Sequence, residues 1–283
     1  MRKTGISDKI GNCHKEYCDS SFYYSRGLNP DCNKASGGMH TDLQRKAAKA
    51  AANLAPIPLL AELNKGEMMY QTLLFDMDGT VLDTLGDLTA AINYTMRQYG
   101  EPEHTIDEIR SYVGNGVVKL LERSIPNGHE AKNFDEQMKT YQDYYAIHDR
   151  DLTKPYDGIP ELMEWARQQG TRIGIVSNKH HSAVVELSEH FFGDLVDAAA
   201  GNKPGGKTKP DPTVVFDVMD ELSAEPGTTV YIGDSDVDAA TAANAGLDCI
   251  LVSWGFRPKE LLLEQKAKAV VDSVDELKRA IMM

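Results

Sequence analysis

Cysteine is scarce in this chain, and the few cysteines are unevenly placed. Three of the four (Cys13, Cys18 and Cys32) lie near the N-terminus, and only Cys249 belongs to the rest. Cys249 sits on an apolar run, which predicts a buried side chain that behaves as a small hydrophobe. This usage fits a reducing compartment, and we expect a cytoplasmic protein.

Long apolar runs are also missing. No stretch of the sequence approaches the ~18 apolar residues that a bilayer span needs, and the N-terminus lacks the apolar core of a signal peptide. We therefore expect no membrane partner. The length of 283 residues predicts one large domain with a smaller one beside it.

Positive charge is the third shortage. The chain has 30 Lys and Arg against 43 Asp and Glu, a net charge of -13, which argues against nucleic acid as a partner. The imbalance is confined to one part of the chain. Residues 1–69 hold 10 basic and 7 acidic side chains, whereas the remainder holds 20 and 36. Such asymmetry indicates an appended segment.

Residues 1–69 match no other part of the chain. They are polar and aperiodic up to about Gly38, and residues 41–55 could form a short helix capped by Thr41. We predict a disordered or non-native extension; a partner-binding or targeting arm is the alternative. A zinc site is disfavoured because C-x2-C spacing and apolar packing residues are lacking. Its ligands would be Cys13, His14, Cys18, Cys32 and His40.

From Tyr70 onward, short apolar runs alternate with amphipathic stretches. Strands are predicted at residues 71–76, 172–177, 195–199, 229–234, 249–253 and 269–271. Helices are predicted at residues 159–169, 182–192, 212–222, 237–245 and 274–281. This alternation predicts an α/β fold, a Rossmann-like doubly wound parallel sheet covered on both faces. Residues 70–83 and 157–283 would form this core.

The interval 84–156 breaks the alternation, because it reads as helical throughout. About seventy residues inserted after the first strand are too many for a simple crossover. We predict that they form a separate helical cap over the site, between the first strand and the second polar cluster.

Polar side chains gather where the predicted strands end. In an open parallel sheet, ligands bind beyond the carboxyl ends of the strands, so these residues should share one edge. They are Asp76 and Asp78 after the first strand, Ser177 and Asn178 after the second, Asp234 and Asp238 after the fourth, and Lys209 in the loop before the helix near Pro212.

The chemistry of this set points to phosphate. Converging carboxylates repel one another, and a Mg²⁺ ion with its preference for oxygen ligands resolves that repulsion. A lysine and a hydroxyl add donors for an anion, and an aspartate can attack phosphorus to form an aspartyl phosphate. Taken singly, Ser177 and Asp234 could equally be helix caps, and we interpret Asp236, His180 and His181 as cap or exposed helix-start residues.

Four motifs resemble those of the haloacid dehalogenase-like hydrolases. They are D-M-D-G-T-V-L-D-T at residues 76–84, S-N at 177–178, K-P-D-P at 209–212 and G-D-S-D-V-D at 233–238, in that family's order. The resemblance spans residues 70–283 and implies a phosphatase with a small phosphorylated metabolite as its partner.

The resemblance also implies roles. Asp76 would be the nucleophile, Asp78 the acid and base, and Lys209 would neutralise charge in the transition state. Ser177 and the Asn178 backbone would hold the phosphoryl group, and Gly79 and Thr80 join the substrate-binding set. Mg²⁺ would be held by Asp76, Asp234 and the Asp78 carbonyl, while Asp238 would help hold the metal or orient Lys209. Lys203 and Lys207 in the same loop leave open which lysine reaches the phosphate.

The second aspartate narrows the reaction. Asp78 favours phosphoryl over halide chemistry, because halide departure needs no proton. A phosphonate-cleaving relative would need a lid lysine, and Lys119 does not stand in such a context. Leu88 occupies the place where mutase relatives usually carry a histidine.

The cap gives the clue to the substrate. Residues 111–117, S-Y-V-G-N-G-V, resemble the substrate loop of phosphoglycolate phosphatases, so Asn115, Gly116 and Arg123 are candidates to bind the substrate. A helix-breaking turn is the alternative reading of this loop. A pyrophosphatase, a nucleotidase and a catalytically silent binding protein are the competing functions. The sequence leaves the oligomeric state open.

Overall fold

The computed structural model describes residues 70–282. The N-terminal extension, its short helix and the alternative zinc site therefore lie outside the described residues. Among the described residues, no helix is both long and apolar enough to cross a membrane.

Within residues 70–282, a six-stranded parallel sheet forms the centre of the core, with strand order β5-β4-β1-β6-β7-β8. The strands are β1 (Thr72–Phe75), β4 (Arg172–His180), β5 (Ala198–Asn202), β6 (Thr229–Gly233), β7 (Asp248–Val252) and β8 (Ala269–Val271). β1 is fully buried and lies between β4 and β6, so three of the polar clusters come from adjacent strands.

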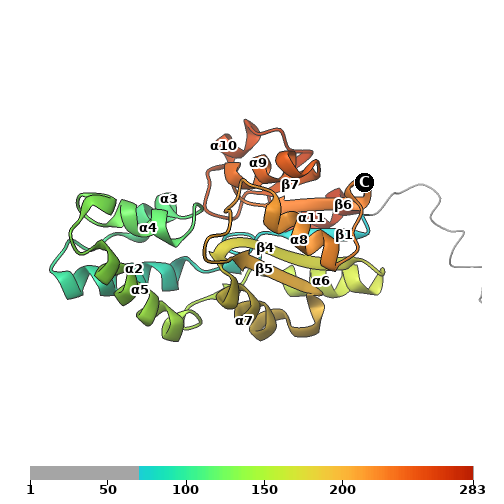
Figure 1. The fold of residues 1–283 in the computed structure, drawn as a ribbon. Coiled ribbons are helices and arrows are strands. Elements are labelled where there is room, and N and C mark those ends of the chain that lie inside the picture. Colours follow the sequence, from blue (N-terminus) through green and yellow to red (C-terminus); the bar gives the residue numbers. More distant parts are fainter. Residues whose placement is uncertain (1–69, 283) are drawn as a thin grey trace, which may run out of the picture. The chain divides into compact units, whose positions relative to one another are not determined.

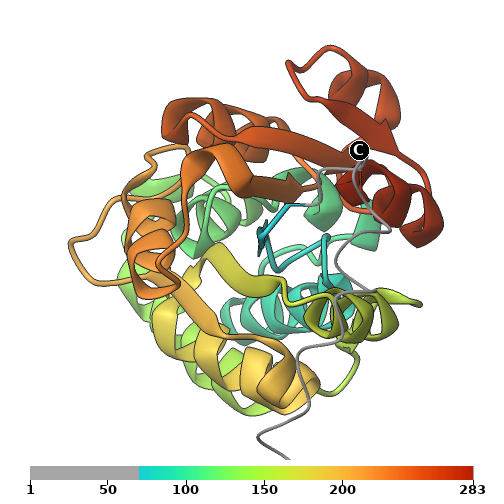
Figure 2. The ribbon, with the colours of Figure 1, turned by 90° about the vertical axis from the view of Figure 1, so that its right-hand side faces the viewer.

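Helices cover both faces of this sheet (Figures 1 and 2). One apolar cluster joins one face to α6 (Ile159–Gln168), α7 (His181–Phe192) and α11 (Val274–Met282). A second cluster joins the opposite face to α8 (Thr213–Glu221), α9 (Asp236–Ala245) and α10 (Lys259–Leu263). Alternate residues of one strand serve the two clusters: Leu73 and Phe75 face the first, and Leu74 faces the second. The predicted doubly wound parallel sheet is confirmed.

Four α-helices lie between β2 and β3 in the chain, and we call residues 84–156 the cap. Its helices are α2 (Leu85–Tyr99), α3 (Ile106–Tyr112), α4 (Val117–Ser124) and α5 (Phe134–His148). They pack around an apolar cluster of their own, to which the core contributes Phe256. A short antiparallel pair, β2 (Leu82–Asp83) with β3 (Lys154–Pro155), joins the two ends of the cap where they enter the core.

Two strands differ from the expected ranges by three residues, and the other predicted strands differ by at most one residue at each end. β4 continues through His180, past the predicted end at Ser177, because its last residues pair with β5 after a shift in register. β5 begins at Ala198 instead of residue 195, since residues 193–195 form a 3₁₀ turn. Further 3₁₀ turns lie at Gly128–Glu130 and Pro226–Thr228.

Candidate active site

Three carboxyl groups converge at the carboxyl edge of β1 and β6. Asp76 follows β1, Asp234 follows β6, and Asp238 stands in the first turn of α9. Oxygens of these three groups lie within 4.8 Å of one another, and all three residues are buried. The sequence predicted that these carboxylates lie at one edge of the sheet. They meet there because β1 and β6 are neighbouring strands.

Glycines make room for Asp234. Gly79 has φ +87, and a Cβ there would lie 2.5 Å from Asp234 Oδ2. A Cβ on Gly255 would lie 2.3 Å from the same oxygen. A side chain at either position would therefore displace the Asp234 carboxylate, and at Gly79 it would also strain the backbone. Thr80 is buried next to Gly79, and its carbonyl accepts from Trp254 Nε1 at 3.2 Å.

Lys209 is the counter-charge of this cluster. Its Nζ lies 2.8 Å from Asp76 Oδ1 and 2.7 Å from Asp238 Oδ1, and it donates to the Tyr231 hydroxyl at 3.1 Å. Although burial alone lowers the pKa of Lys209, Asp238 and Asp76 raise it well above its ordinary value. The group is therefore a fixed cation. Lys203 and Lys207 are exposed, and Lys207 pairs with Asp211.

Asp238 is fully buried and heavily hydrogen-bonded. Oδ1 accepts from Lys209 Nζ and lies 3.3 Å from the Tyr231 hydroxyl, while Oδ2 accepts from Ser235 Oγ and the Asp234 amide. This arrangement favours a role in orienting Lys209. By contrast, Asp76 Oδ1 pairs with Lys209 Nζ, and Asp234 Oδ2 accepts from the Phe256 amide at 2.6 Å.

The electrostatics of the cluster fit a divalent cation. Burial and the neighbouring Asp238 raise the pKa of Asp76 well above its ordinary value, and the same two causes raise the pKa of Asp234 to about 7. These raised pKa values show that the positive charge of one lysine does not balance the negative charge of three buried carboxylates. Carboxylate oxygens are what Mg²⁺ prefers, so the donor set could hold this metal.

A pH dependence follows from Asp234. Its pKa is about 7 in the metal-free folded protein against an ordinary value of 3.8, so the folded state holds an extra proton between these values. The contribution of Asp234 to the free energy of unfolding is fully present below pH ~4 and is lost as the pH rises through about 7. A Mg²⁺ ion bound at Asp234 would have to displace that proton, so apparent Mg²⁺ affinity should increase between pH 6 and pH 8. Calorimetric Mg²⁺ titrations across this range, with unfolding curves in chelator, measure both trends; affinity independent of pH would contradict the assignment.

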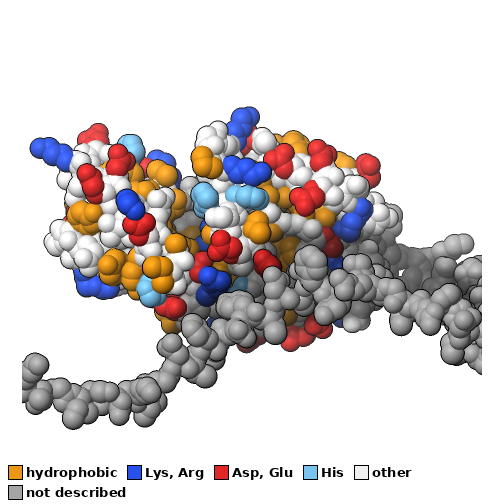
Figure 3. All heavy atoms as spheres, turned by 60° about the horizontal axis from the view of Figure 1, so that its bottom comes forward, with side chains coloured by type: hydrophobic (Ala, Val, Ile, Leu, Met, Phe, Trp, Pro, Cys, Tyr) orange, Lys and Arg blue, Asp and Glu red, His pale blue; other side chains and the backbone are white. Residues whose placement is uncertain are grey.

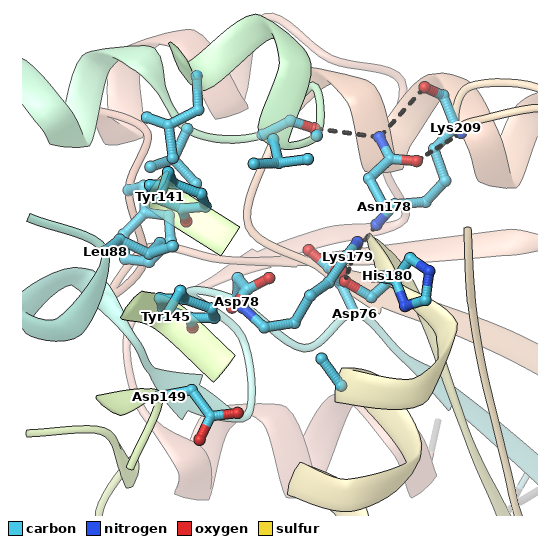
Figure 4. A pocket seen from close by; sticks show the side chains of 18 of the residues that line it. Asp76, Asp78, Leu88, Tyr141, Tyr145, Asp149, Asn178, Lys179, His180 and Lys209 are labelled. Carbon is cyan, nitrogen blue, oxygen red and sulfur yellow. Dashed lines mark hydrogen bonds and ion pairs between the residues drawn. The ribbon is translucent and has the colours of Figure 1, made fainter. Parts of the chain in front are cut away.

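Ser177 and Asn178 end the buried part of β4 and face the same cavity. The Asn178 side chain accepts from the Lys209 amide at 2.7 Å and donates to the carbonyls of Gly114, in the cap, and Lys209 (Figure 4). Asn178 therefore fixes the loop that carries Lys209 and ties it to the cap.

Asp78 stands apart from the carboxylate cluster. Its Oδ1 pairs with Lys179 Nζ at 3.0 Å, and the Lys179 side chain is 8% exposed. Sequence reasoning missed Lys179, although one signal was present: Ser177 and Lys179 are two residues apart, and residues so spaced share one face of a strand.

Only part of the cap loop lines the cavity, although Asn115, Gly116 and Arg123 were all candidates to bind the substrate. Gly114 and Gly116 line the cavity, but Asn115 and Arg123 are not among the described residues that line it. Arg123 instead donates to the Tyr112 carbonyl at 2.6 Å and to Asn115 Oδ1 at 2.8 Å. Arg257, which sequence reasoning also missed, does line the cavity and donates to the Val113 carbonyl at 2.6 Å.

A cavity of about 410 Å³ lies between the cap and the core. Asp76, Asp78, Ser177, Lys209 and Asp234 form its polar end, and cap residues such as Leu88 and Tyr141 form its apolar wall (Figure 4). On the face drawn in Figure 3, a groove separates the cap from the core, and side chains of both charges are interspersed. The volume falls in the range of small-molecule sites.

Comparison with known proteins agrees with this arrangement. The family model described as haloacid dehalogenase-like hydrolase matches residues 73–252. Phosphoglycolate phosphatase of Aquifex aeolicus is 30% identical over 192 residues, which cover 66% of this chain and 86% of that protein. Phosphoglycolate phosphatase 1 of Pseudomonas aeruginosa is 27% identical over 215 residues, covering 72% and 77%.

A solved structure adds to the likeness. The crystal structure of a candidate phosphoglycolate phosphatase from Lactobacillus delbrueckii subsp. bulgaricus superposes with a TM-score of 0.72 at 35% identity, covering 76% of this chain and 99% of that one. The resemblance expected from the four motifs is confirmed: the chain is an enzyme of the haloacid dehalogenase-like hydrolase family, similar to phosphoglycolate phosphatases.

Proposed function

We propose that this protein is a Mg²⁺-dependent phosphatase that hydrolyses a small phosphomonoester through an aspartyl phosphate on Asp76, with 2-phosphoglycolate as the first substrate to test. The observation that carries the proposal is the environment of Asp76. Its carboxylate is buried at the end of β1, 2.8 Å from the Lys209 ammonium, beside Asp234, and opens into the cavity.

The residues divide the reaction between them. Asp76 attacks phosphorus in line, and Asp78 protonates the leaving oxygen as its bond to phosphorus breaks. Asp78 then takes a proton from water, which attacks the phosphorus of the aspartyl phosphate and releases phosphate. Lys209 and Ser177 hold the phosphoryl oxygens during both steps. Asp76 and Asp234 would hold Mg²⁺, which would supply positive charge that stabilises these oxygens.

The substrate assignment draws on two observations. The relatives named above are phosphoglycolate phosphatases, and the cavity is of a size for a small metabolite. Asn115 and Arg123 stay predicted substrate residues. Their mutual hydrogen bond outside the cavity favours an indirect role, in which they shape the loop that carries Gly114 and Gly116.

A substrate panel tests the proposal. Phosphate release should be measured with and without Mg²⁺ on 2-phosphoglycolate, pyrophosphate, a hexose phosphate and a nucleoside monophosphate. We expect Mg²⁺-dependent release with the highest kcat/KM on 2-phosphoglycolate. A higher kcat/KM on pyrophosphate or on the nucleotide would change the assigned substrate, but it would leave the proposed phosphatase mechanism in place. Failure on every compound would leave a binding protein and overturn the proposal.

A further inference from the structure

Lys179 is a buried cation that the proposed reaction does not use. Its side chain extends from β4 toward the cap, where Nζ pairs with Asp78 at 3.0 Å and lies 4.7 Å from the centroid of the Tyr145 ring (Figure 4). A cation over an aromatic face is attracted to it, so Tyr145 and Asp78 together hold the ammonium in one place.

The two buried lysines of the cavity, Lys179 and Lys209, contact different carboxylates. Lys209 contacts Asp76 and Asp238, and it therefore faces the phosphoryl group. Lys179 contacts Asp78, the residue that protonates the leaving oxygen in the function proposed above. In that function, the Lys179 ammonium would consequently lie beside the first atoms of the leaving group.

The other cationic side chains of the cavity wall are engaged elsewhere. Arg257 donates to the carbonyls of Val113 and Arg110 and pairs with Asp236. His180 shares a hydrogen bond with Ser182 and is exposed. Among the described residues that line the cavity, Lys179 is thus the cation best placed to meet a charge on the leaving group.

The remaining wall would not favour an anion without Lys179. It is largely apolar or aromatic, with Leu88, Leu120, Tyr141 and Tyr145. Two more carboxylates also line the cavity: Asp149, which pairs with Arg150, and Glu186, which is exposed. Negative charge on a leaving group therefore needs a dedicated partner here.

We propose that Lys179 determines specificity by binding a carboxylate one carbon from the ester oxygen, so that the substrate class is the phosphomonoesters of 2-hydroxy acids. In such a compound a single carbon separates the ester oxygen from the carboxylate. Asp78 and Lys179, which are 3.0 Å apart, can meet these two groups at once. 2-Phosphoglycolate is the smallest member. The inference rests on the proposed function.

The test compares 2-phosphoglycolate with ethyl phosphate, which has a methyl group in place of the carboxylate. Lys179→Met should lower kcat/KM for 2-phosphoglycolate roughly 10- to 100-fold, mainly through KM, because a hydrogen bond to a charged group is lost. Activity on ethyl phosphate should change far less. Lys179→Arg should restore part of the loss, and Lys132→Met, at an exposed cap position outside the cavity wall, should change neither substrate.

A second measurement separates a loss of substrate binding from misfolding and from a change in turnover alone. In the Asp76→Asn background, calorimetry should show that Lys179→Met weakens binding of 2-phosphoglycolate and leaves binding of ethyl phosphate unchanged, with equal unfolding temperatures. Equal losses on both compounds would overturn the inference, since Lys179 would then act only through Asp78. A wild-type enzyme that hydrolyses other phosphomonoesters but does not prefer 2-phosphoglycolate to ethyl phosphate would also overturn it, with the phosphatase proposal intact.

Discussion

Asp76→Asn should lower kcat on every phosphomonoester on the order of 10⁴-fold or more, because an amide cannot form the acyl phosphate. The protein should stay folded. The substitution removes one of three mutually repelling buried carboxylates, and Asp238 still accepts from Lys209 at 2.7 Å. Phosphate release and an unfolding curve on the same sample separate loss of chemistry from loss of structure.

The matched control is Asp157→Asn, which makes the same chemical change at an exposed turn. We expect Asp157→Asn to retain the activity of the unaltered protein. Full activity in Asp76→Asn would show that another group attacks phosphorus.

Lys209→Met should abolish turnover and also destabilise the metal-free protein by about 3–5 kcal/mol, because it leaves buried carboxylates without their counter-charge. Lys209 pairs with both Asp76 and Asp238, and its side chain is 3% exposed. If Mg²⁺ binds this cluster as proposed, it adds positive charge there, so saturating Mg²⁺ should stabilise Lys209→Met more than it stabilises the unaltered protein. Denaturant unfolding with chelator and with Mg²⁺ gives the two differences.

Lys207→Met is the control for this change, since Lys207 belongs to the same loop and its side chain is 69% exposed. It should alter stability by less than ~0.5 kcal/mol and leave turnover intact. If Lys207→Met and Lys209→Met were equally damaging, the loop as a whole and not the buried ammonium would be responsible.

Periodicity predicted most of the fold, because the buried strands are short apolar runs between turn residues. β1 and β6 lie where the sequence places them, within a residue or two at each end. β5 was misplaced because residues 195–196 are more apolar than the alanines that follow. The sheet instead takes small residues there: a Cβ on Gly201 would lie 2.4 Å from the Lys179 carbonyl. Close approach of two strands cannot be read from hydrophobicity.

The site was predictable where its residues end strands, and less so where it depends on contacts between distant segments. Asp76, Asp234 and Lys209 meet because β1, β6 and the loop before α8 share one edge. Lys179 was not predicted as a site residue, because a lysine that follows an apolar strand is typical of a strand end exposed to solvent. Its burial depends on Tyr145, which approaches from the cap. The hydrogen bond between Asn178 and Gly114 likewise joins parts of the chain that only the folded structure brings together.

Trapping the covalent intermediate tests the central claim most directly. Enzyme turning over 2-phosphoglycolate with Mg²⁺ should be quenched rapidly in acid and reduced with borohydride, which converts an aspartyl phosphate to homoserine. Mass spectrometry of the peptides should then show homoserine at position 76, only when both substrate and Mg²⁺ were present. Homoserine at another aspartate, or steady phosphate release with unmodified Asp76, would contradict the account.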